Sequence, residues 1–381
     1  MKQTPLTAAC SGGNEKIVQV LIDKGSDVNQ VDFMGQTPLT AAWSEGHEEI
    51  VQLLIDKGID VYQFDGFMLT PLTTACSGGN EKIVQLLKDK GSDVNQVDGM
   101  KQTPLMAACS GGNEKIVHVL IDKESDVNQF DGCRLTLLTT ACSGGNEKIV
   151  HVLIDKGSDV NQFDGCRLTL LTSACSRGNE KIVRVLIDKG SDVNQFDGCR
   201  LTPLTTACSR GHEEIVQLLI DKGSDVNQFD GFRLTPLTTA CSGGDEKLVQ
   251  LLIDKGSDVN QVDGMKQTPL TTACSGGNEK IVQVLKDKGS DVNQFDGFRL
   301  TPLTTACSGG NEKLVQLLID KGSDLNKAGA YGGTPRTITC DRENEKIVKL
   351  LLDRGSDVNQ VDGMKQTPLM AACRRGNMKI V

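Results

Sequence analysis

Cysteine and histidine are the side chains of this sequence that could bind a metal, form disulfides or act as nucleophiles. Eleven of its fourteen cysteines recur at intervals of 33 residues or a multiple of 33: Cys10, Cys76, Cys109, Cys142, Cys175, Cys208, Cys241, Cys274, Cys307, Cys340 and Cys373. Stacked helices stand about 8–10 Å apart, whereas a disulfide needs Cα atoms within about 7 Å. We therefore expect this column to supply small buried core residues in a reducing compartment.

Metal-binding and catalytic patterns are absent from the sequence. There is no Cys-x-x-Cys, and the four histidines (His47, His118, His151 and His212) are spread over four different 33-residue units. No phosphate-binding loop or Gly-x-Ser-x-Gly motif occurs. The paired carboxylates of Glu48 and Glu49 are expected at an exposed helix start. The sequence therefore predicts a protein that is not an enzyme and that has no cofactor.

The elements that position these residues follow from an internal repeat. The tripeptide Thr-Pro-Leu, or a decayed form of it, begins twelve units with no insertion or deletion between them. These units start at Thr4, Thr37, Thr70, Thr103, Thr136, Thr169, Thr202, Thr235, Thr268, Thr301, Thr334 and Thr367. We interpret residues 1–381 as a single repeat array, in which the first and last units are truncated.

Each unit is predicted to form two short helices and an extended turn. Thr4 is suited to cap the first helix and Pro5 to occupy its first position, where the missing N–H costs nothing. Gly12 and Gly13 break this helix, and Asn14 can cap a second helix with an apolar stripe. Gly25 suits the left-handed residue that ends the second helix. One unit buries too little apolar surface alone, so stacking on neighbours must form the core.

The motifs Thr-Pro-Leu-x-x-Ala, Ile-Val-x-x-Leu-Leu and Gly-x-Asp-Val-Asn, at a period of 33, resemble the ankyrin repeat. The resemblance covers essentially the whole chain. It implies an all-α, right-handed solenoid in which the first helices and the turn tips, or fingers, form a concave groove. It also implies a non-catalytic scaffold that binds partner proteins. Met1 aligns with Met100, Met265 and Met364 and both ends cut through a repeat, so we expect a fragment of a longer array. The alternative function is a structural spacer within a larger protein, which the near-identity of the repeats favours.

The chain departs from the ankyrin pattern at several positions. Threonine replaces the histidine usual after Thr-Pro-Leu, and the finger glycine mostly moves to follow the aspartate, so both the side-chain network and the finger shape should differ. In the unit that begins at Thr334, Arg336, Thr339 and Glu343 replace Leu, Ala and Gly; we expect this repeat to be the loosest interior one. Glu124 likewise replaces a glycine expected to be left-handed.

The fingers vary at their tips and carry a nearly continuous row of basic residues. Together with two arginines at the ends of first helices, the fingers from Gly132 to Arg233 form a candidate strip. Its members are Cys133, Arg134, Leu135, Cys166, Arg167, Leu168, Arg177, Cys199, Arg200, Leu201, Arg210, Phe232, Arg233 and Leu234. Such a strip suits a partner protein with acidic and apolar contact residues. Alternatively, finger aspartates such as Asp131 neutralise the arginines and the leucines pack between fingers.

Two further features leave alternatives open. Trp43 stands in the cysteine column, so it is either an anchor that faces the groove or part of a repacked repeat. The resemblance also implies that Asn29 and Asn161 could be hydroxylated, since a leucine precedes each by eight residues. The alternative is that these asparagines stabilise their turns.

The composition of the chain argues against several other classes of function. The net charge is −9 and aromatic residues make up 3% of the chain, which argues against binding to nucleic acid or to an anionic membrane. No apolar run is long enough to span a bilayer, and no signal peptide is visible. We expect an intracellular protein of the cytoplasm or nucleus.

Overall fold

The computed structural model describes residues 3–121, 127–329 and 332–381. Met1 and Glu124, which the sequence singled out, lie outside these residues. The chain divides into two compact units, Met1–Ser191 and Asp192–Val381, and each is described by itself. The described residues form 23 α-helices and no strands.

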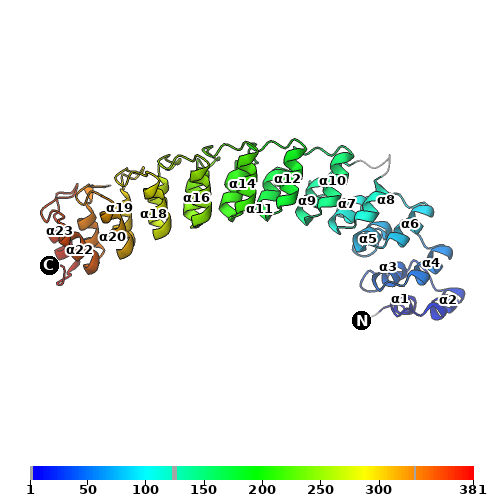
Figure 1. Cartoon of the computed structure of the whole chain (residues 1–381). Helices are drawn as coiled ribbons and strands as arrows, with labels where there is room; N and C mark the ends of the chain where they lie inside the picture. The colour runs from blue at the N-terminus through cyan, green and yellow to red at the C-terminus, as the bar shows by residue number, and fades with distance from the viewer. Residues whose placement is uncertain (1–2, 122–126, 330–331) are drawn as a thin grey trace. The chain divides into compact units, whose positions relative to one another are not determined.

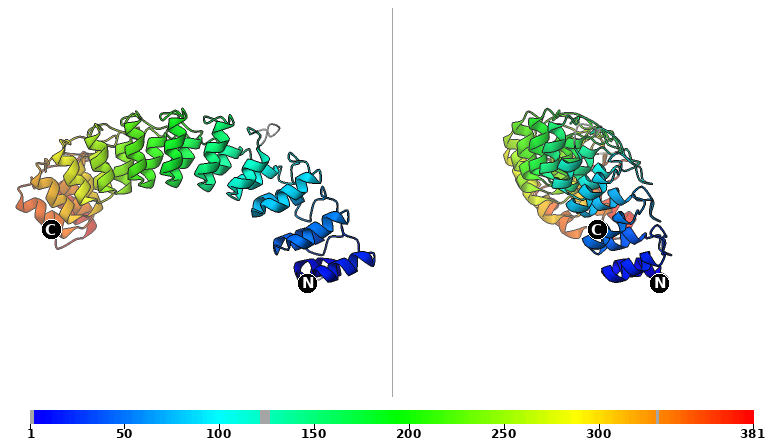
Figure 2. Two further views of the ribbon diagram at one scale, coloured as in Figure 1. Left: turned by 45° about the vertical axis from the view of Figure 1, so that its right-hand side comes forward. Right: turned by 90° about the vertical axis from the view of Figure 1, so that its right-hand side faces the viewer.

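Each repeat but the last, which contributes only α23, supplies two consecutive helices, and Figures 1 and 2 show these helix pairs stacked one after another within each unit. The first unit contains α1 (Pro5–Ser11), α2 (Glu15–Asp23), α3 (Pro38–Ser44), α4 (Glu48–Asp56), α5 (Pro71–Gly78), α6 (Glu81–Asp89), α7 (Pro104–Ser110), α8 (Glu114–Leu120), α9 (Leu137–Gly144), α10 (Glu147–Asp155), α11 (Leu170–Arg177) and α12 (Glu180–Asp188). The odd-numbered helices are the first helices of their repeats and the even-numbered ones the second.

The second unit continues the alternation. It contains α13 (Pro203–Arg210), α14 (Glu213–Asp221), α15 (Pro236–Gly243), α16 (Glu246–Asp254), α17 (Pro269–Ser275), α18 (Glu279–Asp287), α19 (Pro302–Gly309), α20 (Glu312–Asp320), α21 (Pro335–Asp341), α22 (Glu345–Asp353) and α23 (Pro368–Arg375).

A threonine hydroxyl starts every first helix. Thr37, for example, accepts a hydrogen bond from the backbone N–H of Thr40 at 3.1 Å, and the Thr40 hydroxyl accepts one from the N–H of Thr37 at 2.7 Å. These reciprocal bonds satisfy donors that a helix start leaves unpaired. The threonine that replaces histidine therefore serves the cap of its own helix.

The core lies between the two helices of each repeat and between consecutive repeats. In the third repeat, Leu72 and Cys76 of α5 and Ile83, Val84 and Leu87 of α6 are all buried. Fully burying such an aliphatic side chain stabilises the fold by roughly 1.5–3 kcal/mol.

The cysteine column is buried as predicted except at Cys373 in α23, which is exposed. The prediction for Cys373 was wrong because, among the described residues, no further first helix packs on α23. Burial of a column cysteine thus depends on the first helix of the next repeat.

Desolvation makes buried column cysteines such as Cys109 and Cys142 poor nucleophiles. Burial raises the pKa of Cys109 and of Cys142 to about 12. The thiolate is the reactive form of cysteine, so these thiols are protonated and inert at neutral pH. All fourteen cysteines are free thiols.

Asparagine side chains join consecutive repeats. Asn113 donates from Nδ2 to the carbonyl of Cys76 in the preceding repeat at 2.8 Å. His47 takes the same position and lies 3.2 Å from the Ser11 carbonyl, which confirms its structural placement. His118 and His151 are exposed on second helices, as expected.

Within the described residues, no helix combines the length and the apolar character needed to cross a membrane.

Candidate protein-binding surface of the fingers

An aspartate holds the base of each finger except the one before Thr334, where Gly329 takes its place. In the finger of residues 131–135, Asp131 Oδ1 accepts hydrogen bonds from the backbone N–H groups of Cys133 and Leu135, both at 2.8 Å. The N–H of Asp131 donates to the Leu135 carbonyl at 3.0 Å, which closes the turn. The fingers that follow Asp164, Asp197 and Asp230 repeat this pattern. The aspartate is therefore a turn residue whose carboxylate points back into its own finger.

The basic residue of each finger has a left-handed backbone. Arg134, Arg167, Arg200 and Arg233 have φ between 60° and 63°, a conformation that costs a non-glycine residue roughly 1–2 kcal/mol. In the second unit, the N–H of Gly231 donates to the carbonyl of Arg200 at 2.5 Å. A Cβ on Gly231 would overlap the Cβ of Arg200.

This contact explains the displaced glycine. Glycine stands where each finger comes close to the preceding finger, and the strained left-handed backbone falls on the arginine instead. That this finger shape differs from the usual ankyrin finger stays a prediction from the sequence.

The guanidinium groups of the strip have no acidic partner. Across the residues that the structure describes, no carboxylate lies within 4.0 Å of a side-chain nitrogen of Arg134 or Arg167 in the first unit, nor of Arg200 or Arg233 in the second. The neighbouring aspartates bind backbone amides instead. Among the described residues, the finger aspartates therefore form no ion pairs with these arginines.

The other strip residues fall into three placements. The tips at Cys133, Cys166, Cys199 and Phe232 are exposed. Arg177 and Arg210 are also exposed or half-buried at the surface, in the last turns of α11 and α13. Half-buried leucines follow the arginines: Leu135, Leu168, Leu201 and Leu234. The leucines thus belong partly to the finger stack, as the packing alternative proposed, and partly to its surface.

A column of phenylalanines on the fingers was not predicted. Phe130 and Phe163 in the first unit are 50% and 44% exposed, and Phe196 and Phe229 in the second are 42% and 37% exposed. Each directly precedes a finger aspartate, so the 33-residue period itself was the signal that could have found them. Their rings add exposed aromatic area to the fingers that carry these arginines.

One member of this column already contacts cations. The Phe295 ring lies 4.5 Å from Lys327 Nζ and 5.8 Å from the Arg299 guanidinium carbon. Cations attract aromatic faces at such distances. This finger shows that the ring and the basic side chain of one repeat lie together.

Trp43 packs against the next first helix. A Cβ on Gly78 of α5 would overlap the Trp43 ring, so the indole occupies space that this glycine leaves free. Trp43 is half-buried, and its Nε1 is buried without a hydrogen-bond partner. This placement favours the interpretation that the second repeat is repacked around Trp43, and not that Trp43 is an anchor facing the groove.

Asn29 and Asn161 bridge repeats through their side chains. Asn29 Oδ1 accepts from the backbone N–H of Asp60 at 2.9 Å, and Asn161 Nδ2 approaches the Gly190 carbonyl at 3.5 Å. These hydrogen bonds support the alternative in which Asn29 and Asn161 stabilise their turns.

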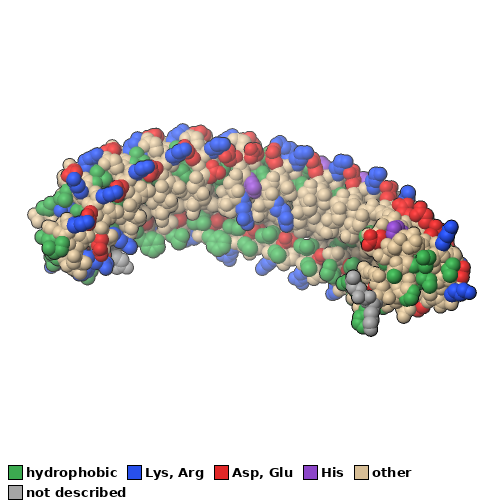
Figure 3. Space-filling view, turned by 90° about the horizontal axis from the view of Figure 1, so that it is seen from below, with side chains coloured by type: hydrophobic (Ala, Val, Ile, Leu, Met, Phe, Trp, Pro, Cys, Tyr) green, Lys and Arg blue, Asp and Glu red, His purple; other side chains and the backbone are tan. Residues whose placement is uncertain are grey.

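The second helices carry their charges in a different way. Lysines pair with carboxylates one repeat earlier in two rows, which we call the second-helix ladders. Examples are Lys148 with Glu114 at 2.9 Å and Lys288 with Asp254 at 2.8 Å. Figure 3 shows basic and acidic side chains alternating in rows along one edge of the surface. These pairs were not predicted, and each contributes about 0–1 kcal/mol.

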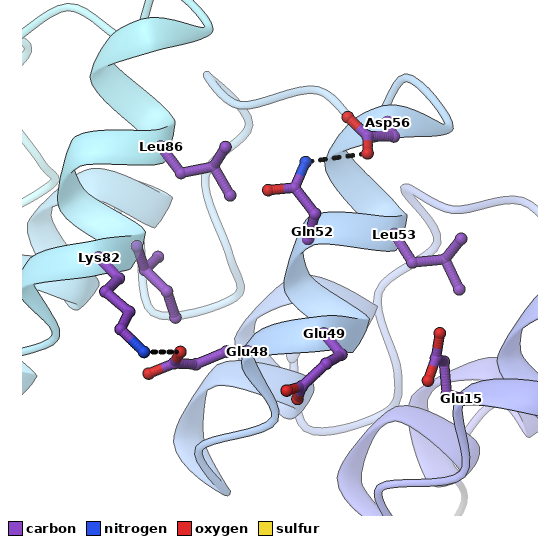
Figure 4. Close-up of a pocket in the computed structure, with 9 residues that line it drawn as sticks. Glu15, Glu48, Glu49, Gln52, Leu53, Asp56, Lys82 and Leu86 are labelled. Carbon is purple, nitrogen blue, oxygen red and sulfur yellow. Dashed lines mark hydrogen bonds and ion pairs between the residues drawn. The ribbon is translucent and has the colours of Figure 1, made fainter.

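A hollow of about 510 Å³ lies between α2, α4 and α6 (Figure 4). Glu15, Glu48, Glu49 and Asp56 line it, and Lys82 pairs with Glu48 at 2.9 Å. Its carboxylates are solvated, and they belong partly to the second-helix ladders. In the part of the chain that is described, no three His, Cys, Asp or Glu side chains are grouped as a metal site would need.

Comparisons with known proteins agree with this architecture. The family model described as ankyrin repeats (3 copies) matches residues 1–65, 64–131, 138–230, 190–263, 228–296 and 294–362. Among curated proteins, none matches this sequence.

One similar solved structure is the crystal structure of the human ASB11 ankyrin repeat domain, at 23% identity and a TM-score of 0.54. The match covers 58% of this chain and 99% of that one, and at this identity it supports the fold alone. Family match, repeat period and helix pairs together show that the chain belongs to the ankyrin-repeat family.

Proposed function

We propose that this chain is a non-catalytic protein-interaction scaffold that binds partner proteins through its fingers and the adjoining ends of its first helices. Ankyrin repeats are generally protein-interaction modules. The observation that carries the proposal is the contrast between paired lysines on the second helices and unpaired arginines on the fingers. Exposed arginines and aromatic rings are both typical of interface anchors.

The partner is proposed to present acidic and apolar side chains. Arg134 and Arg167 in the first unit, and Arg200 and Arg233 in the second, would meet carboxylates. The phenylalanines and the half-buried leucines beside them would meet apolar groups. Affinity would be summed over several repeats.

Capture of proteins from a cell lysate tests this proposal. The finger variant changes Arg134, Arg167, Arg200 and Arg233 to Glu. A control variant of the same net charge changes Lys148, Lys181, Lys255 and Lys288 of the second-helix ladders to Glu. Circular dichroism must show equal helicity for all three proteins. We expect specific partners to be lost from the finger variant and kept by the control.

The same experiment tests the spacer alternative. If no protein is retained specifically by the unchanged array, the chain is better explained as a structural element of a larger protein. If all three arrays retain the same proteins, the fingers are not the binding surface.

Further parts of the proposal have their own support. The unbroken 33-residue period supports one continuous array. A column of buried free thiols supports a reducing intracellular compartment, the cytoplasm or nucleus.

Hydroxylation of Asn29 and Asn161 remains a proposal, and intact-mass and peptide mass spectrometry of the native protein would detect the added oxygen.

A further inference from the structure

Four consecutive fingers of the second unit present a basic residue in the same backbone conformation. Arg200, Arg233, Lys266 and Arg299 all have φ between 58° and 63°. All four are exposed, and in the described residues none of them has a carboxylate within 4.0 Å. This row extends beyond Arg233, where the strip seen in the sequence ended.

Contacts between fingers fix where these side chains begin. The carbonyls of Arg200, Arg233 and Lys266 accept hydrogen bonds from the N–H groups of the next fingers' glycines, at 2.5, 2.6 and 2.9 Å respectively. The Cβ, Cγ and Cδ atoms of Arg200 lie over Gly231, and the same atoms of Arg233 lie over Gly264. The stems of Arg200, Arg233 and Lys266 therefore begin from the same place in their repeats, so the row presents one cation per repeat.

The aspartates of these fingers leave the row uncompensated. Asp230 and Asp296 each accept two backbone hydrogen bonds through Oδ1, at 2.7 to 2.9 Å. Their carboxylates are thus committed to the turns. An incoming carboxylate would be the first acidic partner for each basic side chain.

The distance between consecutive finger cations favours one backbone conformation in a bound segment. Packed helices stand about 8–10 Å apart, so the cations recur at about that interval. A polyproline II chain repeats every three residues and rises about 3.1 Å per residue, so the same face returns every ~9.3 Å. A β-strand returns to one face every two residues, about 6.6 Å, and would fall out of register.

Aromatic rings in three of the four fingers favour the same partner. Phe196, Phe229 and Phe295 stand four residues before Arg200, Arg233 and Arg299, and the first two are 42% and 37% exposed. The Phe295 ring lies 5.8 Å from the Arg299 guanidinium carbon, whereas Val262 takes this place in the finger of Lys266. Proline-rich extended segments dock on aromatic-lined surfaces and lose little conformational entropy on binding.

We propose that the finger row of the second unit binds an extended, polyproline II-like protein segment that carries an acidic residue at every third position. This inference rests on the proposed function and names the chemistry of its partner. Each carboxylate would meet one finger cation, and the two residues between carboxylates would lie against the rings.

Fluorescence anisotropy with two labelled peptides of identical composition tests the register. One peptide is (Glu-Pro-Pro)5, and the other joins five glutamates to ten prolines. We expect the full chain to bind the periodic peptide at least about tenfold more tightly, a difference of about 1.4 kcal/mol. General charge attraction would favour the clustered peptide instead, so equal or reversed affinities overturn the proposal.

Matched variants assign the binding to the fingers. Changing Arg200, Arg233, Lys266 and Arg299 to Glu should abolish the preference for the periodic peptide. Changing Lys255, Lys280, Lys288 and Lys321 of the second-helix ladders to Glu gives the same net charge and should preserve it. Loss of the preference in this control variant contradicts the proposal. Changing Arg200, Arg233 and Arg299 to Lys should retain most of the binding.

Other occupants are separate outcomes. Tighter binding of a helical peptide with glutamate at every seventh residue, or of an oligouridine, would overturn the inference. If lysate capture depends on the fingers but the two peptides bind equally, the proposed function stands and the inference fails. If capture does not depend on the fingers, the proposed function itself fails.

Discussion

Two consecutive repeats of the second unit, beginning at Thr301 and Thr334, share one helix pattern but differ in their cores. In the first, Leu303 and Ala306 are fully buried, and Gly310 takes the left-handed position after α19 with φ of 72°. In the second, arginine, threonine and glutamate stand at these three positions. Both first helices nevertheless begin with a threonine capping box.

The substitutions in the second repeat leave buried polar atoms unpaired and strain the backbone. Nε and Nη1 of Arg336 are buried without a hydrogen-bond partner, and desolvation lowers the pKa of this guanidinium. Thr339 is fully buried, and its hydroxyl donates to the Arg336 carbonyl at 2.9 Å. Glu343 has φ of 59°. Local capping signals thus form the helices of both repeats, while packing decides how stable each repeat is.

The largest expected effect comes from moving the arginine into the regular repeat. Changing Leu303 to Arg should lower the free energy of unfolding by about 3 kcal/mol, because a buried cation would lack a partner. Chemical denaturation followed by circular dichroism measures this. A Leu303→Met variant keeps the volume and should cost less than about 1.5 kcal/mol. A loss below about 1 kcal/mol for Leu303→Arg would show that the position tolerates charge.

The reverse exchange should stabilise the irregular repeat. Changing Arg336 to Leu removes two unpaired buried nitrogens and should raise the local stability by about 2 kcal/mol. Hydrogen exchange by mass spectrometry should show slower exchange in α21 and α22, with α19 and α20 as the internal reference. Equal protection of all interior repeats in the unchanged protein would contradict the expectation that this repeat is the loosest.

A smaller gain in the free energy of unfolding is expected at residue 343, whose backbone is left-handed. Changing Glu343 to Gly should stabilise the repeat by roughly 1 kcal/mol, since glycine adopts positive φ without the steric cost. The reciprocal change, Gly310 to Glu, should cost a similar amount in the regular repeat. Thermal and denaturant unfolding of both variants would compare them, and opposite signs are the expected result.

The smallest effect concerns the ion pairs between Asp341 of α21 and two arginines of α23. Asp341 accepts from Arg374 Nη2 at 2.7 Å and from Arg375 Nε at 3.0 Å. The hydrogen bonds from Arg375 and Arg374 lower the pKa of Asp341 to about 2. Because the folded pKa lies below the unfolded value of about 3.9, this carboxylate stabilises the fold above about pH 4. That contribution is lost as the pH falls toward about 2.

Changing Asp341 to Asn should therefore cost less than about 1 kcal/mol at about pH 7, since the pair is partly exposed. The difference between variant and parent should shrink as the pH falls from about 4 toward about 2. Urea unfolding at a series of pH values measures it, and a pH-independent difference would assign the effect to packing instead.

The sequence predicted most of the fold because its signals are local and repeated. Threonine caps, Gly-Gly breaks and the apolar stripes each act within a few residues, and twelve copies reinforce one another. The same locality explains why Arg336, Thr339 and Glu343 could be singled out as departures. The prediction for Cys373 was wrong because the burial of a column cysteine depends on a helix of the neighbouring repeat, which is a contact in space and not a local signal.

The candidate site was predicted in part. The finger arginines and exposed tip cysteines were identified from their period, whereas the phenylalanine column beside them was overlooked although it has the same period. Whether Trp43 faces outward could not be decided from sequence, since the answer depends on the space over Gly78 in the next repeat.

By itself, the sequence determined the repeat length, the helices with their caps and the composition of the core, because these depend on neighbours along the chain. Tertiary structure alone decided which charges are paired. Residues 34 positions apart, such as Asp254 and Lys288, meet only when repeats stack. Likewise, Arg200 stays unpaired because Asp197 turns its carboxylate toward the backbone of its own finger. Partners of charged groups are set by distance in space, which a repeat period alone does not specify.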